Sequence, residues 1–237
     1  MPPDVSIHEA AGQGDIEAVK QLLAAGADLN EKDEDFRWTP LQHAIMSGQL
    51  EVVRILIKYN SDIHVRDDNG CTLLHLAQTK EIAELLIGEG ADINASGPSK
   101  SCPLSSAVWD GNKEVAEFLI RQGANVNSTD ILGATTLHEA ASAAHKELVK
   151  ILITYGANVN AIDRCGMSPL YKAARMGKVG MVELLLSLGA KVNIIDNEYN
   201  WTPLNWVKAR QLTKLEKILR KHGAKTAEEL KTEATSQ

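Results

Sequence analysis

Residues 134–141 bring hydroxyl, imidazole and carboxylate side chains close together in the sequence. The segment ATTLHEAA contains Thr135, Thr136, His138 and Glu139, whose residue types serve hydrolases as nucleophile, base and acid. Nucleophilic catalysis needs three such groups oriented by the fold, usually from distant segments of the chain. One histidine beside a hydroxyl and a carboxylate is therefore a weak indication of an active site, and the surrounding sequence must be considered.

The composition is that of a folded chain inside a cell. The 237 residues are 44% hydrophobic and only 4% aromatic, which argues against disorder. No window approaches 18 apolar residues in a row, and the start, MPPDVSIHEA, lacks a basic and then apolar signal segment. The three cysteines, Cys71, Cys102 and Cys165, lack the paired spacing of zinc sites. We therefore expect a soluble cytoplasmic protein with reduced thiols.

The charge of the chain is negative and unevenly distributed. The formal net charge is -6, with 8 Lys and Arg against 17 Asp and Glu in residues 1–100, and 17 against 14 in residues 101–237. Binding to nucleic acid or to an anionic membrane rests on clustered Lys and Arg. We therefore expect neither of these as a partner.

One sequence pattern recurs along nearly the whole chain. TPLQHAIMSGQLEVVRILIKYNSDI, TTLHEAASAAHKELVKILITYGANVN and SPLYKAARMGKVGMVELLLSLGAKVN share one frame. A period of this length is the signature of stacked repeats. The repeats start at Val5, Thr39, Thr72, Cys102, Thr135, Ser168 and Thr202, at spacings of 30 to 34 residues.

Each part of the pattern has a physical reason. A Ser or Thr such as Ser168 suits the N-cap of a helix, and the proline that follows suits the first helical position. Apolar residues then recur at helical period in two successive segments, which predicts two helices per repeat. Glycine closes most second helices in the left-handed conformation, and Asn60 takes that place in the second repeat.

The repeated motif resembles the ankyrin repeat, whose signature is T-P-L-H-x-A-A followed by V-V-x-x-L-L and G-A-x-x-N. The resemblance covers residues 5–224 and implies an all-α solenoid of seven helix-turn-helix units with hairpin loops. We expect one ankyrin-repeat domain over residues 5–224, with atypical capping repeats at both ends, and a monomer. Residues 225–237 form a tail, either a short helix that starts at Thr226 or a disordered segment.

The repeat explains the candidate active-site residues. Histidine recurs at one phase, as His8, His75 and His138, and a catalytic base would not be copied along a rod. The ankyrin resemblance implies that these imidazoles bridge backbone and hydroxyl groups of the motif. The histidines outside that phase are expected to be solvated, and they are His43, His64, His145 and His222.

The third repeat is shorter than the others. Between Thr72 and Gly90 it has lost the residues that normally hold the turn glycine between the helices. Its first helix must be short or its turn tightened, and residues 78–102 are expected to form the weakest joint of the chain. This is either a tolerated deletion or a notch in the binding face.

The predicted binding face consists of the hairpin tips and first helices, the concave side in the ankyrin resemblance. Trp, Tyr and Arg are the residue types enriched at interface hot spots. Trp109 is the strongest candidate, whereas Trp38 and Trp201 either bind or brace their hairpins. The candidate partner-binding side chains are Phe36, Arg37, Trp38, Met46, Trp109, Asp110, Ile131, Leu132, Arg164, Met167, Arg175, Met176, Tyr199, Trp201 and Trp206.

The sequence therefore predicts a non-catalytic scaffold that binds a partner protein or peptide. An enzyme is disfavoured because the chain lacks a phosphate-binding glycine loop, H-E-x-x-H and C-x-x-C, so no cofactor or metal is expected. A regulatory inhibitor, an assembly chaperone and a bacterial effector remain alternatives that use the same surface. The family resemblance also raises hydroxylation of Asn94, Asn127, Asn160 and Asn193, whose simpler interpretation is hairpin stabilisation.

Overall fold

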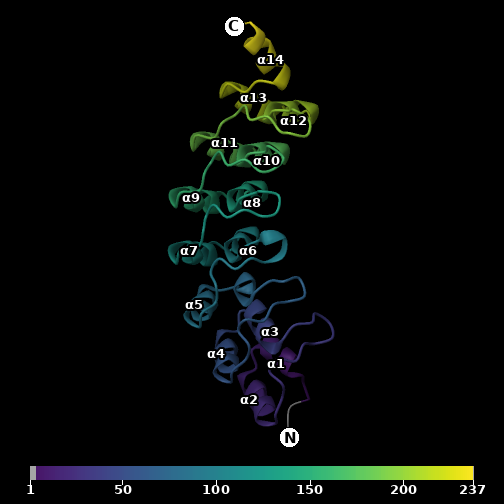
Figure 1. Cartoon of the computed structure of the whole chain (residues 1–237), viewed down its shortest axis with the longest axis vertical. Coiled ribbons are helices and arrows are strands. Elements are labelled where there is room, and N and C mark those ends of the chain that lie inside the picture. The colour runs from purple at the N-terminus through teal and green to yellow at the C-terminus, as the bar shows by residue number, and fades with distance from the viewer. Residues whose placement is uncertain (1–3, 237) are drawn as a thin grey trace. The chain divides into compact units, whose positions relative to one another are not determined.

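The computed structural model describes residues 4–236, and the regular structure in that part of the chain is helical (Figure 1). Its contacts divide the chain into two compact units, Met1–Ala124 and Asn125–Gln237. Each predicted repeat start is followed by a pair of helices, so the predicted all-α helix-turn-helix architecture is confirmed.

The first unit contains the helices of repeats one to four. Successive first helices pack on one another, α1 on α3, α3 on η1 and η1 on α6, and the second helices do the same. The elements are α1 (Ile7–Gln13), α2 (Ile16–Ala24), α3 (Pro40–Met46), α4 (Leu50–Lys58), the 3-10 helix η1 (Leu73–Leu76), α5 (Lys80–Gly88), the 3-10 helix η2 (Pro98–Lys100), α6 (Pro103–Trp109) and α7 (Lys113–Arg121).

The second unit contains repeats five to seven and a terminal helix. Here α10 packs between α8 and α12, and α11 packs on α13. The elements are α8 (Thr136–Ala143), α9 (Lys146–Thr154), α10 (Pro169–Arg175), α11 (Val179–Ser187), α12 (Pro203–Ala209), α13 (Thr213–Lys221) and α14 (Ala227–Thr235).

The helix starts and stops follow the local sequence rules. Thr39 accepts from the backbone N–H of Gln42 while the Gln42 side chain accepts from Thr39, which closes a capping box. Asn60 adopts a φ of 65° in place of glycine, as predicted. From the second repeat onward the first helix carries a fully buried leucine, for example Leu41 and Leu170, and such burial contributes about 1.5–3 kcal/mol per side chain.

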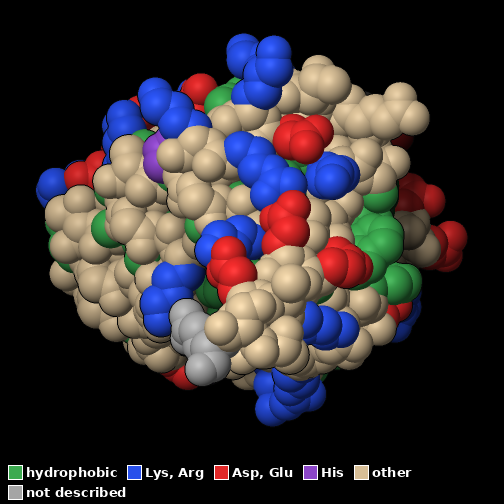
Figure 2. All heavy atoms as spheres, turned by 90° about the horizontal axis from the view of Figure 1, so that it is seen from above, with side chains coloured by type: hydrophobic (Ala, Val, Ile, Leu, Met, Phe, Trp, Pro, Cys, Tyr) green, Lys and Arg blue, Asp and Glu red, His purple; other side chains and the backbone are tan. Residues whose placement is uncertain are grey.

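The two ends of the chain carry extra polar contacts. Ser6 accepts from the backbone N–H of Glu9, whereas the Glu9 carboxylate accepts from the side chain of Gln13 and so does not complete a capping box. At the other end Thr226 and Glu229 form a full capping box that begins α14. Figure 2 looks onto this C-terminal end and shows acidic and basic side chains interspersed over it. This mixture suits a solenoid end that faces water.

Asparagine side chains join successive repeats of the second unit. The side-chain amide of Asn160 donates to the carbonyl of Gly189 (3.4 Å) and accepts from the backbone N–H of Lys191 (2.7 Å). Asn127 and Asn193 make the same pair of bonds to the repeats that follow them. Both polar ends of each amide are therefore used, which supports the interpretation that these asparagines stabilise the hairpins.

The motif histidines are structural, as the repeat implied. His138 Nδ1 accepts from the backbone N–H of Thr135 (3.0 Å), and its Nε2–H donates to the carbonyl of Met167 in the next repeat (3.0 Å). His75 makes the equivalent bonds to Thr72 and Ser101. Both ring nitrogens of His138 are occupied and the ring is fully buried, so this imidazole has no free nitrogen with which to act as a base.

The third repeat is irregular where the sequence shortens it. Its first helix is the single 3-10 turn η1, and the backbone leaves it at Ala77 in an extended conformation. Leu73, Leu74 and Leu76 are nevertheless buried. The repeat thus keeps its apolar contacts while losing helical hydrogen bonds, since a 3-10 turn has poorer geometry than an α-helix.

We expect native-state hydrogen exchange to be faster in residues 73–84 than in residues 136–147 of the fifth repeat. A short 3-10 turn opens at lower cost than an eight-residue helix held on both sides. Exchange followed by mass spectrometry on proteolytic fragments measures this, with the first helix of the sixth repeat as the regular control. Equal protection of the two segments would show that no weak joint exists.

Glu139 is a partly buried carboxyl group next to His138. Its Oε2 has no hydrogen-bond partner in residues 4–236. Burial raises the pKa of Glu139 to about 7; the charge of Asp130 adds to this and Lys172 opposes it. The folded chain therefore holds this proton more tightly than the unfolded chain, whose glutamate pKa is 4.5. Ionisation of Glu139 consequently costs stability as the pH rises from 4.5 through 7.

The variant Glu139→Gln should be more stable than the wild type at pH 8, by on the order of 2 kcal/mol. At pH 4.5 the difference should largely vanish, because the wild-type carboxyl is then protonated. Urea unfolding at the two pH values measures the change, and Glu183→Gln on the exposed face of α11 is the control. A stability gain that is equal at both pH values would contradict the assigned ionisation.

Candidate functional site

Three aromatic side chains of the second unit meet on the seventh repeat. Tyr199 and Trp201 lie on the hairpin before α12, and Trp206 lies on α12 itself. The ring centroids are 5.8 Å apart for Tyr199 and Trp201, 5.5 Å for Tyr199 and Trp206, and 5.0 Å for Trp201 and Trp206. We call these three residues the aromatic cluster. Tyr199 is 50% exposed, so the cluster presents aromatic surface to solvent.

Arg175 at the end of α10 packs against this cluster. Its guanidinium carbon lies 4.9 Å from the centroid of the Trp206 ring, a cation–π arrangement. Its Nη1 also approaches the sulfur of Met167 at 3.6 Å. Met167 is buried, so Arg175 packs against a side chain of the protein core. Met176, the next residue after α10, is 57% exposed.

A buried tyrosine holds Trp206 in place. The Tyr171 hydroxyl donates to the carboxylate of Asp196 and accepts from the indole N–H of Trp206. Burial raises the pKa of Tyr171, and the Asp196 carboxylate adds to this. For Asp196, burial raises the pKa, but the hydrogen bonds from Tyr171 and from backbone N–H groups outweigh it and leave a lowered pKa. The bridge therefore joins a neutral hydroxyl to an ionised carboxylate.

The repeat pattern does not predict this bridge. Tyr171 occupies the motif-histidine position of the sixth repeat. A tyrosine at that phase reaches farther than histidine, and Asp196 begins the aromatic hairpin. Together these two features of the sequence could have indicated the hydrogen bond between Tyr171 and Asp196.

The hairpin tips of the second unit are joined by backbone hydrogen bonds. The N–H of Arg164 donates to the carbonyl of Leu132 (2.8 Å), and the N–H of Asn197 donates to that of Cys165 (2.8 Å). Ile131 and Leu132 are 43% and 54% exposed. Successive tips therefore form one edge, on which these apolar residues, Arg164 and Tyr199 all face solvent.

The first unit carries a similar aromatic hairpin. Phe36 and Trp38 pack on each other at 5.5 Å, and Trp38 packs on His43 of α3 at 5.4 Å. Asp33 accepts from the backbone N–H of Trp38 (2.7 Å), as Asp196 accepts from backbone N–H groups of its own hairpin. Arg37 adopts a positive φ of 57° in the first hairpin, and Asn200 does so in the second at 54°. The two hairpins therefore share one conformation.

His43 corrects one sequence expectation. It was expected to be solvated, but its side chain is only 18% exposed and lies 3.1 Å from the Asp33 carboxylate. The rings of His8, Phe36 and Trp38 pack around it. The reason is the long hairpin, which folds its aromatic residues over the start of α3.

Trp109 is the most exposed of the large apolar side chains, at 69%. It ends α6, and within residues 4–236 its indole has no aromatic partner. Asp110 beside it is also exposed. Met46, which ends α3, is 44% exposed and accepts a weak bond from Gln78. The first unit thus presents Trp109 from α6 and Met46 from α3.

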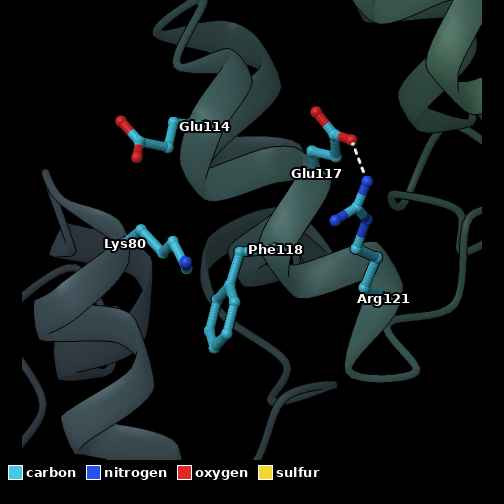
Figure 3. Close-up of a pocket in the computed structure, with 5 residues that line it drawn as sticks. All are labelled: Lys80, Glu114, Glu117, Phe118 and Arg121. Carbon is cyan, nitrogen blue, oxygen red and sulfur yellow. Dashed lines mark hydrogen bonds and ion pairs between the residues drawn. The ribbon is translucent and has the colours of Figure 1, made fainter.

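A cavity on the other side of the first unit is unsuited to catalysis. It measures about 210 Å³ and lies between α5 and α7 (Figure 3). Lys80 extends toward the ring of Phe118, and Glu117 is paired with Arg121 at 2.7 Å. Glu114 completes the lining and points away from Lys80. The side chains include no nucleophile oriented by a base.

Two further features concern metal binding and membrane-spanning helices. Throughout the described part of the chain, no three His, Cys, Asp or Glu side chains converge in a way that would hold a metal ion. None of the helices within residues 4–236 is long and apolar enough to span a bilayer.

Comparison with known proteins agrees with the fold. A family model of ankyrin repeats matches residues 7–97 and 104–196. The crystal structure of the human ASB11 ankyrin repeat domain superposes with a TM-score of 0.82 at 24% identity, over 92% of this chain and 97% of that one.

Among curated proteins, the mouse protein phosphatase 1 regulatory subunit 27 is 36% identical over 106 residues, which are 44% of this chain and 69% of that protein. The mouse 2-5A-dependent ribonuclease is 39% identical over 69 residues, 29% of this chain but only 9% of the enzyme. The match to the ribonuclease thus covers a small part of that protein. From the repeated motif, the stacked helix pairs and these matches together, the chain belongs to the ankyrin-repeat family.

Proposed function

We propose that the chain is a non-catalytic scaffold that binds a partner protein or peptide on its hairpin tips and first helices. This is the concave face in the ankyrin resemblance. The candidate anchors are Trp109 and the Phe36 hairpin in the first unit, and the aromatic cluster in the second unit. A regulatory role of the kind named for the phosphatase subunit is a second candidate, and it would use the same surface.

The observation that carries the proposal is the exposure of large apolar side chains at the ends of packed helices. Trp109 ends α6 and Met176 directly follows α10, and most residues of these two helices are buried, so burial of either side chain by a partner costs little ordering of the chain. Binding energy concentrates in such anchors, and truncating one costs about 2 kcal/mol or more. The buried leucines and the bonded histidines already serve the fold, which leaves these exterior groups for recognition.

The alternative of an enzyme finds no support in the geometry. His138 uses both ring nitrogens within the motif: Nδ1 contacts the backbone N–H and the hydroxyl of Thr135, and Nε2–H donates to the carbonyl of Met167. The cavity between α5 and α7 holds paired charges. General base catalysis needs a base within hydrogen-bond reach of a reacting group, and a base that substrate can approach. His138 and the Thr135 hydroxyl that it contacts are both buried, which supports a structural role for the pair.

The variants Trp109→Ala and Arg175→Glu should each weaken binding of the partner. Each removes an anchor from a different unit, so we expect losses of about 2 kcal/mol, roughly 30-fold in Kd. The partner is first identified by affinity purification and mass spectrometry, and its titration against each purified variant then gives the Kd. The melting temperatures should change little, because Trp109 is exposed and Arg175 is a half-buried residue at a helix end that forms no ion pair with any described residue.

Two control variants test whether the loss of binding is specific to the proposed face, or follows from removing any exposed aromatic residue or any positive charge. Tyr59→Ala removes an aromatic residue that is 53% exposed at the end of α4. Lys217→Glu makes the same charge change as Arg175→Glu on α13. Both control variants should bind with the wild-type Kd. Normal binding by both Trp109→Ala and Arg175→Glu would place the partner on another surface.

A further inference from the structure

Three arginines lie on the hairpin tip and first-helix ends of the sixth and seventh repeats. Within the described residues, Arg164, Arg175 and Arg210 form no ion pair. Arg210 donates to the backbone carbonyl of Arg175 (2.6 Å), and Arg175 lies over Trp206. We call these three residues the arginine surface. Each guanidinium offers five N–H donors, so most of the donors on this surface face solvent or a ligand.

The buried carboxylates of the same hairpins are already occupied. Asp163 pairs with Lys172 at 2.9 Å and its side chain is 2% exposed. Asp196 accepts from Tyr171 and from its own hairpin. Glu198 is the exposed acidic residue of the aromatic hairpin. These hairpins therefore expose one carboxylate, that of Glu198, beside three guanidinium groups. The arginine surface consequently has an excess of positive charge.

The matching hairpin of the first unit has the opposite charge. Glu31, Glu34 and Asp35 are exposed beside Phe36. The one arginine of that hairpin, Arg37, lies 3.8 Å from the Asp68 carboxylate. The two hairpins share a backbone conformation and aromatic content, so charge is what distinguishes the ligands they would accept. An acidic ligand would be repelled by the first and attracted by the second.

The aromatic cluster is fixed in a shape that can receive an anchor. The Tyr171 hydroxyl holds the indole of Trp206, and Trp206 in turn supports the guanidinium of Arg175. A side chain locked in its bound geometry loses little entropy when a ligand arrives. A guanidinium that is stacked on a ring keeps its edge N–H donors free for a carboxylate.

We infer that the arginine surface and the aromatic cluster together bind an acidic segment of a partner protein that carries an aromatic or aliphatic anchor. This inference rests on the proposed function and specifies its ligand in the second unit. Carboxylates of the segment pair with Arg164, Arg175 and Arg210, and the anchor contacts Tyr199 and Trp201.

The four tryptophans allow a test that resolves the two units. Trp38 and Trp109 belong to the first unit, and Trp201 and Trp206 belong to the second. In the ¹⁵N-labelled full chain, each indole N–H gives one NMR signal, which single Trp→Phe variants assign. The probe is a short synthetic peptide of Asp and Glu residues around a Leu-Phe pair, and a peptide with Lys at every acidic position is its counterpart.

The acidic peptide should shift the signals of Trp201 and Trp206 in a saturable way and leave those of Trp38 and Trp109 in place. Addition of NaCl should weaken this binding, since exposed charges are screened. Arg175→Gln and Arg210→Gln should each raise the Kd roughly tenfold. Arg210 is exposed, so Arg210→Gln measures the contribution of this surface to binding even if Arg175→Gln perturbs the fold. Lys217→Gln on α13 is the charge-matched control and should bind normally.

Several results would overturn the inference. These results are unmoved signals of Trp201 and Trp206, equal shifts with the lysine peptide, or binding by both arginine variants that is as tight as that of the control. Saturable binding of a short DNA duplex at the same signals would assign the surface to nucleic acid instead. The proposed function is tested separately. If Trp109→Ala weakens binding of the purified partner while the acidic peptide does not bind, the scaffold function holds and only the inferred ligand class is wrong.

Discussion

Burial of the first-helix apolar face between neighbouring repeats is the interaction on which the structure depends. Leu137 and Leu170 are fully buried, as are the alanines that let adjacent helices approach closely. The helices are only seven to nine residues long, too short to be stable alone in water. Each pair is therefore stable only when stacked on its neighbours, and the motif side chains are consumed by that stacking.

Polar groups fix the repeats once the apolar contacts have brought them together. An aspartate at the head of each complete hairpin, for example Asp67 or Asp163, accepts backbone N–H groups of its own turn. Asn160 and His138 then bond to the following repeat. These bonds satisfy backbone groups that stacking would otherwise bury without partners, a cost of about 1–3 kcal/mol each.

The exposed aromatic residues lie where the sequence departs from the repeated motif. Where the hairpin glycine is replaced and one residue is added, as around Arg37 and Asn200, the turn carries aromatic rings back over the next helix. Where tyrosine replaces the motif histidine, its hydroxyl reaches the next hairpin and fixes Trp206. The regular positions build the scaffold, and the irregular ones build its candidate binding surface.

The sequence by itself determined the class of fold, the repeat starts, the helix caps and the structural role of His138, because these features depend on local periodicity and on spacing that every repeat shares. It also placed Arg175 and the aromatic residues of the seventh repeat in one candidate set. Only the tertiary structure decided that Met167 is buried beneath Arg175, that His43 is packed rather than solvated, and that Tyr171 bridges Asp196 and Trp206. These outcomes depend on side-chain rotamers and on the path of two long hairpins, which leave no periodic trace in the sequence. The Tyr171 bridge in addition joins residues 25 and 35 positions apart.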